Sequence, residues 1–564
     1  MNTTTQGDSP NQRPARLDLL AILSVALILR AFRLSVTDTF DQDSVEYMWM
    51  ADSIRRHDWN HFLLSGLYWS PFFPCLIAGL QSVLGDQVLS GRVVGVLADL
   101  CVVAITYLLS REISRNVGAA RLSTLIVATH PTMISLSVFI MSDSLYCAVA
   151  TASIFCLVKL LNTHRVRYAV WMGALCALSF ATRTYGLCFG LAMLALWALL
   201  AFWQARQDAG AASAPVALVS GVVTFVILCS AWVVPLSIHN RALTVGTSGT
   251  LNLYWRFLAA QGNSLEVVRN GYRNGRVGTP PVGPDEAAEF GHLIFSLPTT
   301  DPRFPRGVYR QVLANPRVAI SMVGRNALRA AQEVATLGYG IIPLLALLDV
   351  LTRGHSPRGR RVRIVLALAA VLQVAGYIPI LVLRRYVLPT LPLISVLAMD
   401  ALTRLPGGAL STRAGSLYAR FPKRLIVLVV CAWCMVGPTL YVFRTAQMGL
   451  HPRRNLQREI GTWVRNHIGE DRLIVSRHLE CVYWARGRFL VLPVGTPSEI
   501  LDWARRGNAD ILVITREGRD VEHRDTFCQQ FLHSDGWREY RGVRLTADFL
   551  DAGGTRYGRV FALH

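Results

Sequence analysis

A cluster of acids near the start of the chain has the clearest capacity for chemistry. Asp38, Asp41, Asp43 and Glu46 lie within nine residues, directly after the first apolar segment. A carboxylate at the mouth of a membrane cavity, partly removed from water, has a raised pKa and can serve as a general base. A solvated loop is the alternative interpretation. The Asp41-x-Asp43 spacing could also hold a divalent cation such as magnesium or manganese, since both prefer oxygen ligands.

A second acid, Asp143, lies in a short polar stretch, Met141-Ser142-Asp143-Ser144, between two apolar segments. Asp or Ser at this place can cap the helix that follows, by accepting hydrogen bonds from its first backbone amides. The carboxylate can also face a substrate, and the two roles are compatible. We therefore treat Asp143 as a candidate catalytic residue.

Two adjacent arginines and a tyrosine, Arg384-Arg385-Tyr386, stand between two late apolar segments. The forked guanidinium group of arginine suits phosphate recognition, so the pair could bind an anion. Arg92 and Arg183, near the ends of other apolar segments, could join them. The alternative is that each side chain extends along the membrane interface and has no ligand.

These residues must be positioned by a membrane protein. Of 564 residues, 52% are hydrophobic and only 16% are charged, which argues against a soluble enzyme and against disorder. The net charge is +21, yet the basic residues stand in short loops between apolar runs, where membrane topology explains them better than nucleic-acid binding.

Runs of about 20 apolar residues can cross a bilayer. We predict eleven such spans, at 17–34, 90–109, 122–138, 145–161, 169–181, 185–202, 216–236, 334–351, 364–383, 386–402 and 425–443. The apolar stretch 70–84 contains Pro71 and Pro74, and we predict that it lies along the surface or re-enters the membrane.

The loops then separate by charge. One side receives most of the loop arginines, while the short loops of the other side hold only Arg183, Arg384 and Arg385. The positive-inside rule makes the first side cytoplasmic. We predict a cytoplasmic tail at 1–16, a transmembrane catalytic domain at 17–444 with outer loops 35–89 and 237–333, and a periplasmic domain at 445–564.

The last domain has the pattern of a small α/β fold. Leu456, Ile460, Trp463 and Val464 recur at helical spacing, and 496–499 resembles a capping box opening a second helix. The segments 473–475, 489–494 and 511–514 are typical of strands. The predicted fold class is mainly α, a polytopic helix bundle with a small C-terminal extracytoplasmic α/β domain.

Several motifs, taken in order, resemble GT-C glycosyltransferases of the family-39-like type, which includes protein O-mannosyltransferases and aminoarabinose transferases. The resemblance rests on six features, which cover about residues 17–400: Asp43-x-x-x-Tyr47, Tyr68–Pro74, Gly91-Arg92-Val93, Asp143, the stretch 232–253, and Arg385-Tyr386-x-Leu388-Pro389. Many members carry an acid where this chain has Ser44, so Asp41 or Glu46 would have to supply any secondary carboxylate.

The resemblance implies a fold and an activity. It implies a GT-C helix bundle in the bacterial inner membrane, moving a sugar from a polyprenyl-phosphate donor to a lipid, glycan or protein acceptor at the periplasmic face. Asp43 would be the base of an inverting transfer, and Asp143 would support it. Tyr47, Arg92, Arg384, Arg385 and Tyr386 would bind substrate, with the arginines stabilising the phosphate that leaves.

Two other functions remain open from the residues. An undecaprenyl-linked polysaccharide ligase or polymerase also needs outer cations and a base. A lipid or sugar transporter would show charges at mid-membrane and paired broken helices, whereas the notable charges here lie at the outer rim. No cofactor is expected beyond the possible divalent cation, and the expected partners are the donor, the acceptor and membrane lipids, without nucleic acid.

Overall fold

The chain forms two compact units, each assembled from three stretches of sequence. The first comprises Met1–Thr37, Trp69–Pro235 and Ala319–Met448, and the second Asp38–Tyr68, Leu236–Val318 and Gly449–His564. The computed structural model describes residues 12–37, 42–207, 214–262, 299–300, 304–351, 357–404, 432, 452–476, 478–492, 497–515, 539–540, 543–550 and 556–563.

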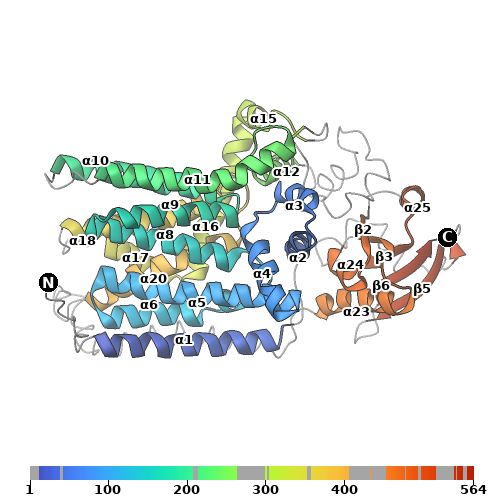
Figure 1. Ribbon diagram of the computed structural model, residues 1–564, viewed down its shortest axis with the longest axis horizontal. Helices are drawn as coiled ribbons and strands as arrows, with labels where there is room; N and C mark the ends of the chain where they lie inside the picture. Colours follow the sequence, from blue (N-terminus) through green and yellow to red (C-terminus); the bar gives the residue numbers. More distant parts are fainter. Residues whose placement is uncertain are drawn as a thin grey trace. The chain divides into compact units, whose positions relative to one another are not determined.

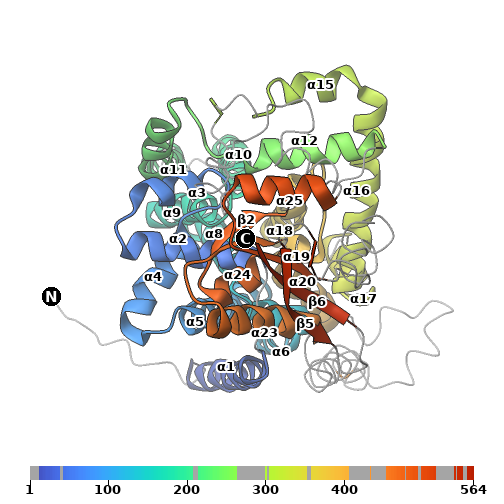
Figure 2. The same ribbon diagram turned by 90° about the vertical axis from the view of Figure 1, so that its right-hand side faces the viewer.

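The first unit is built from helices, most of them apolar. They are α1 (Gln12–Ser35), α4 (Phe72–Leu84), α5 (Gln87–Ser114), α6 (Val117–Thr129), α7 (Pro131–Ser137), α8 (Asp143–Thr163), α9 (Val166–Thr182), α10 (Gly186–Gln207), α11 (Ala214–Asn240), α16 (Pro316–Leu337), α17 (Ile341–Leu351), α18 (Pro357–Ala375), α19 (Arg384–Val387) and α20 (Thr390–Arg404). Helices α1, α5, α6, α8, α9 and α10 run side by side in Figure 1 and appear end-on in Figure 2.

Three of these helices, α5, α8 and α11, are each long and apolar enough to cross a membrane, and α16 with α17 meets the same criterion as a bent pair. Helices α4, α6 and α9, and the apolar part of α10, are shorter. The predicted number of eleven spans stays a prediction, and of the predicted span 425–443 the structure describes residue 432 alone.

The predicted span 334–351 contains a sharp bend. Helices α16 and α17 meet at 101°, and the turn between them is Gly338-Tyr339-Gly340. Tyr339 and Gly340 have φ values of 53° and 73°, which end a right-handed helix, and the Gly340 amide donates to the Ala335 carbonyl at 2.7 Å. Hydropathy alone does not detect this bend, because the residues on both sides of the turn are apolar.

The predicted span 122–138 is likewise divided, between α6 and α7, at His130-Pro131. Proline cannot continue the hydrogen-bond ladder of the preceding helix. His130 Nδ1 accepts from the Thr132 amide at 3.2 Å, so the histidine caps α7. Its Nε2 lies 3.0 Å from the carbonyl oxygen of Leu337, at the end of α16, and so joins the two helix breaks.

Buried ion pairs connect helices of this unit. Arg30 of α1 bonds Asp99 of α5 through Nε and also donates through Nη1 to the carbonyls of Ala26 and Ala128, at 3.0 and 2.8 Å. Both members of the pair are fully buried. Arg363 of α18 in turn bonds Asp349 of α17 and Asp400 of α20. A buried charge is stable only when paired and hydrogen-bonded, so these contacts fix which helices are neighbours.

The second unit begins with α2 (Gln42–Arg55) and α3 (Trp59–Gly66), followed later in the sequence by α12 (Ser248–Ala260) and α15 (Val308–Ala314). Leu67 accepts two hydrogen bonds from Thr247, and Tyr68 accepts one from Asn252 Nδ2 at 2.8 Å. The two stretches, about 180 residues apart, are therefore joined directly.

The rest of the second unit is a mixed six-stranded sheet with helices. Its elements are α23 (Pro452–His467), β1 (Leu473–Ser476), α24 (Leu479–Ala485), β2 (Arg488–Val491), α25 (Pro497–Arg506), β3 (Ile511–Thr515), β4 (Glu539–Tyr540), β5 (Val543–Leu550) and β6 (Arg556–Leu563). The strand order is β2-β1-β3-β6-β5-β4. β2, β1 and β3 are parallel, and β6, β5 and β4 join by antiparallel pairing.

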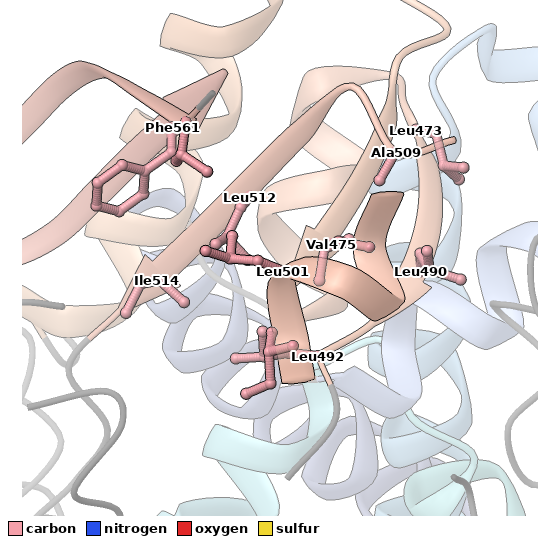
Figure 3. Packing of buried hydrophobic residues seen from close by; sticks show 12 residues of the cluster. Leu473, Val475, Leu490, Leu492, Leu501, Ala509, Leu512, Ile514 and Phe561 are labelled. Atoms are coloured by element: carbon pink, nitrogen blue, oxygen red, sulfur yellow. The ribbon is translucent and has the colours of Figure 1, made fainter. Parts of the chain in front are cut away.

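The sheet and α25 enclose one apolar core. It contains Val475 of β1, Leu490 of β2, Leu501 of α25, Leu512 of β3 and Phe561 of β6, all almost fully buried (Figure 3). The predicted strands 473–475, 489–494 and 511–514 correspond to β1, β2 and β3. The sheet continues with three further strands that the sequence analysis did not identify.

Candidate active site

The centre of the candidate site is an ion pair between two predicted outer loops. Asp143 is the first residue of α8, and its Oδ1 accepts a hydrogen bond from Nη1 of Arg183. Arg183 ends α9 in an extended conformation, with φ −150° and ψ 134°. Since α8 and α9 pack as neighbours, the end of one meets the start of the other. The amino end of α8 also favours a negative charge at Asp143.

Ser142, rather than Asp143, occupies the capping position of α8, and neither residue makes a side-chain cap there. The capping role that the sequence allowed for Asp143 is therefore not the one observed. Its carboxylate, 1% exposed, is directed to Arg183, and its second oxygen has no hydrogen-bond partner among the residues that the structure describes.

Two arginines contact the ring of Tyr386. The guanidinium carbon of Arg183 is 4.9 Å from the centre of its ring and that of Arg385 is 5.3 Å away. Arg385 also donates through Nη1 to the sulfur of Met141, at 3.3 Å, two residues before Asp143. Three of the predicted site residues, Asp143, Arg385 and Tyr386, are thus brought together with Arg183. We call these four residues the arginine–tyrosine cluster.

A row of aromatic rings continues from the cluster into the bundle. Tyr386 stacks on Tyr377 at 4.5 Å with nearly parallel planes, and Tyr377 contacts Tyr185 at 4.1 Å. Tyr185 in turn faces Tyr146, whose hydroxyl donates to Oε1 of Gln373 at 3.1 Å. The stacking on Tyr377 fixes the orientation of the Tyr386 ring, which both arginines contact.

Gly376 makes this row possible. A Cβ atom at this position would lie 1.9 Å from Cε2 of Tyr185, closer than any non-bonded contact. The Gly376 amide also donates to the Tyr185 hydroxyl at 3.3 Å, while that hydroxyl bonds the Leu372 carbonyl. The glycine is therefore needed for a close approach, and its backbone shares in the same hydrogen-bond network.

Several buried polar atoms around the cluster could form further hydrogen bonds. Gln373 Nε2 and the Tyr377 hydroxyl, like Asp143 Oδ2, have no hydrogen-bond partner within the described part of the chain. Leaving such an atom buried and unpaired costs roughly 1–3 kcal/mol. A polar ligand group could form hydrogen bonds with these three atoms.

Arg384 and Arg92 are placed differently. Arg384 is half-exposed and donates through Nε to Glu333 of α16 at 3.0 Å. Arg92, on α5, is buried at 8% exposure, and its neighbour Gly91 packs closely on Ile140, three residues before Asp143. The two adjacent arginines of the sequence motif therefore have different neighbours, and only Arg385 lies against Tyr386.

Asp43 and Tyr47 belong to the second unit. Both are on α2, one helical turn apart, with Asp43 in the first turn and partly buried and Tyr47 buried. Glu46 is 1% exposed on the same helix. Helix α2 packs against α3 and α24. Asp38 and Asp41 lie outside the described residues.

The described residues contain no metal centre, and Cys481 of the C-terminal sheet region is not a reactive thiol. No group of three His, Cys, Asp or Glu side chains there could hold a metal ion. The predicted Asp41-x-Asp43 pair lies partly outside those residues. Burial raises the pKa of the Cys481 thiol to about 12, so it is a neutral thiol at physiological pH.

The arginine–tyrosine cluster has the properties of an anion site. Arg183 pairs with the Asp143 carboxylate, and the guanidinium groups of Arg183 and Arg385 both lie beside the partly buried ring of Tyr386. Arginine binds phosphate through paired hydrogen bonds, and stacking on a ring holds the fork in a fixed plane. The arrangement can therefore hold a phosphate and stabilise negative charge that develops on it.

Comparison with known proteins agrees with this architecture. Residues 69–234 match the family described as dolichyl-phosphate-mannose-protein mannosyltransferase. The structure of ArnT from Cupriavidus metallidurans bound to undecaprenyl phosphate aligns with a TM-score of 0.53 and 14% identity, covering 96% of this chain and 97% of that one. The same protein in the apo state gives a TM-score of 0.51, with the same identity and coverage. No curated protein sequence matches.

The fold is the GT-C fold. The predicted fold class, a mainly helical bundle with a small C-terminal α/β region, is confirmed, as is the predicted resemblance to GT-C transferases. The packing of the bundle brings Arg385 into contact with Met141, which is 244 residues away in the sequence and two residues before Asp143.

Sequence reasoning did not identify four residues around the cluster. Tyr146, Tyr185, Tyr377 and Gln373 were passed over because they lie within or beside predicted spans. A signal was available, since polar residues inside a membrane segment are functional candidates by default. Arg183 was named only as a residue that could join the arginine pair, whereas it is the one that bonds Asp143.

Proposed function

We propose that the chain is an inverting glycosyltransferase of the bacterial inner membrane that moves a sugar from a polyprenyl-phosphate donor to an acceptor at the periplasmic face. The observation that carries the proposal is the arginine–tyrosine cluster within a GT-C fold. The ArnT structure bound to undecaprenyl phosphate supports a lipid phosphate as the donor's leaving group.

The chemistry needs a group that accepts negative charge. When the bond between the anomeric carbon and the phosphate oxygen breaks, its electron pair stays on the phosphate. Arg385 and Arg183 would bind that phosphate and stabilise the charge as it grows. Asp143 would act as a positioning residue, because its ion pair holds Arg183 over Tyr386.

The reaction also needs a base. An acceptor hydroxyl or amine attacks the anomeric carbon from the face opposite the phosphate, which inverts that carbon, and it loses a proton. We assign this proton to Asp43, with Tyr47 contacting substrate one turn further along α2. The assignment is supported by the Asp43-x-x-x-Tyr47 motif and by the place of Asp43 in the first turn of α2, where its side chain is partly buried.

The substrate-binding roles of the remaining predicted residues follow from their neighbours. Arg92 follows Gly91, which packs on Ile140, three residues before Asp143. Arg92 would therefore extend the positive charge around the phosphate. Arg384 is paired with Glu333, so its expected contribution is smaller than that of Arg385.

The test uses the purified protein in lipid nanodiscs with a panel of polyprenyl-phosphate sugars and an extract of envelope lipids and glycans as acceptor source. Release of free polyprenyl phosphate is followed for the wild type, Asp43→Asn and Arg385→Ala. Sugar-dependent release should fall by about 10²- to 10⁴-fold in Asp43→Asn and by about 10²- to 10³-fold in Arg385→Ala.

Arg384→Ala is the matched control, because it removes the neighbouring arginine with the same change in charge. It should keep most of the activity. Unimpaired turnover in Asp43→Asn would overturn the base assignment. No release from any donor, with correctly folded protein, would overturn the proposed transferase.

A further inference from the structure

Helix α16 carries three different faces. Met322, Ala330 and Leu337 are buried against the first unit, and Asn326 on the same side donates to the carbonyls of Ile378 and Ile380, at 2.8 and 3.5 Å. This face therefore attaches the helix to the turn between α18 and α19, which carries Tyr377.

A second face of α16 is apolar but exposed. Ile320 and Leu328 are 71% and 62% exposed, and Val323 is exposed beside them. At 100° per residue these three side chains, with Ala327 and Ala331, lie on one sector next to the buried face, and the one charged residue of this sector is Arg317, exposed in the first turn of the helix. A continuous strip of this kind on a soluble surface would be unfavourable, so it indicates an apolar environment.

The third face is polar and basic. Arg325, Arg329 and Gln332 are exposed on it, and Arg325 donates to Ser321 one turn earlier at 2.9 Å. Glu333, the one acid of this helix, is bonded to Arg384. The exposed face of α16 thus presents positive charge beside an apolar strip.

Helix α16 runs in a different direction from the helices of the bundle. Helices of the bundle appear end-on in Figure 2, whereas α16 is seen from its side and so runs across them. It meets the apolar helix α17 at 101°. On α17, beyond the bend, Leu344, Leu347, Leu348 and Leu351 are exposed as well, so exposed apolar side chains occur on both helices.

We propose that α16 lies in the plane of the membrane surface, with Ile320, Val323 and Leu328 in the acyl boundary and Arg325 and Arg329 against the phosphates of anionic lipids. An amphipathic helix with one basic face and one apolar face binds such an interface in two ways: it buries apolar surface, and its basic side chains attract anionic lipids. Charge complementarity and the exposed leucines of α17 favour a lipid surface over a second protein.

The placement has a consequence for the candidate site. Asn326 and Glu333 connect α16 to the turn that carries Tyr377 and to Arg384, which precedes Arg385. A helix anchored in the headgroup layer would therefore hold the arginine–tyrosine cluster at a fixed depth relative to lipid phosphates.

Membrane depth can be measured without enzymatic activity. An environment-sensitive fluorescent amino acid is placed at position 320 or, in a second variant, at position 332, and the protein is reconstituted in nanodiscs of phosphatidylcholine. Lipids carrying a nitroxide near the top of the acyl chain should quench position 320 and not position 332, while aqueous iodide should quench position 332 and not 320. Equal iodide access at both positions would overturn the proposed orientation.

The charge contribution is measured by lipid retention. The protein is reconstituted in nanodiscs of equal parts phosphatidylcholine and phosphatidylglycerol. It is then released in the mass spectrometer, and native mass spectrometry counts the lipid molecules that stay bound. Arg325→Gln/Arg329→Gln should retain fewer phosphatidylglycerol molecules than the wild type, and Arg325→Lys/Arg329→Lys should retain as many. Unchanged retention in the glutamine variant would overturn the assignment of these arginines to anionic lipid.

Discussion

Two arginine–aspartate pairs in the first unit use the same chemistry for different purposes. Arg30 and Asp99 are both completely buried, and Arg30 also bonds two backbone carbonyls, from α1 and α6. Arg183 and Asp143 lie at helix ends, with Arg183 16% exposed over Tyr386 and one oxygen of Asp143 unpaired within the described part.

The difference separates a structural pair from a binding pair. Arg30 connects three helices, and its role is complete within the fold. Arg183 lies over the ring of Tyr386, which Arg385 also contacts, so the cluster places two guanidinium groups around one ring. Burial and pairing alone therefore do not identify a functional charge, and the unused bonding capacity around it is the more informative feature.

The largest expected effect is on the structural pair. Arg30→Ala leaves Asp99 buried without its partner, so we expect a loss of about 3–5 kcal/mol in stability. Thermal unfolding in detergent or nanodiscs measures it. The double variant Arg30→Met/Asp99→Leu should recover most of the loss, because both charges are then removed. A stable but inactive Arg30→Ala protein would remove the distinction between the two pairs.

The binding pair should respond in activity instead. Arg183→Ala is expected to lower the rate of polyprenyl phosphate release about 100-fold, since one cation of the phosphate site is lost. Asp143→Asn should act through the same arginine, so the double variant should be no worse than Arg183→Ala alone. Additive losses, measured as kcat/KM, would mean that Asp143 acts on substrate independently.

A substitution at Gly376, which packs against the Tyr185 ring, tests whether the aromatic row positions Tyr386. Gly376→Ala would push Cβ into the Tyr185 ring, and we expect a destabilisation of about 1–3 kcal/mol together with a higher KM for donor. Gly79→Ala is the control, because a Cβ atom on that helical glycine meets no atom within 4 Å. If both variants behave alike in unfolding and in KM, the row does not position Tyr386.

The smallest effect is expected at the neighbouring arginine. Arg384 and Glu333 form a half-exposed pair at 3.0 Å, for which about 0.2–1 kcal/mol is typical. Arg384→Ala and Glu333→Gln should therefore lower the melting temperature slightly and by similar amounts, with donor turnover nearly retained. A loss as large as that of Arg385→Ala would place Arg384 in the phosphate site.

The fold was predictable where pattern and length decide it. The runs 90–109 and 145–161 became α5 and α8, and the strand-like segments 473–475 and 511–514 became β1 and β3. The bend at Gly338-Tyr339-Gly340 was not predicted. Hydropathy reports how apolar a segment is, and it contains no information on the positive φ angles that change the direction of the helix. Strands β5 and β6 were missed because their alternation is mixed with charged residues such as Asp548 and Arg559, which bond each other across the sheet.

The candidate site was predictable in its residue types but only partly in its partners. Asp143, Arg385 and Tyr386 could be chosen because charges in short outer loops need a reason. Their arrangement depends on how α9, α18 and α19 pack, and no spacing in the sequence specifies that Arg183 reaches Asp143. Likewise, the motif could not tell which of Arg384 and Arg385 faces Tyr386.

The strand order of the C-terminal sheet has a consequence for synthesis. Strand β6 is the last of the six in sequence, yet it lies between β3 and β5. The parallel and antiparallel halves of the sheet can therefore join only after residues 556–563 have left the ribosome and, in the proposed topology, crossed the membrane. Until then β3 exposes an open backbone edge, the kind of edge that pairs with other chains. The time between translocation of β3 and of β6 is thus the interval in which this domain most needs a chaperone.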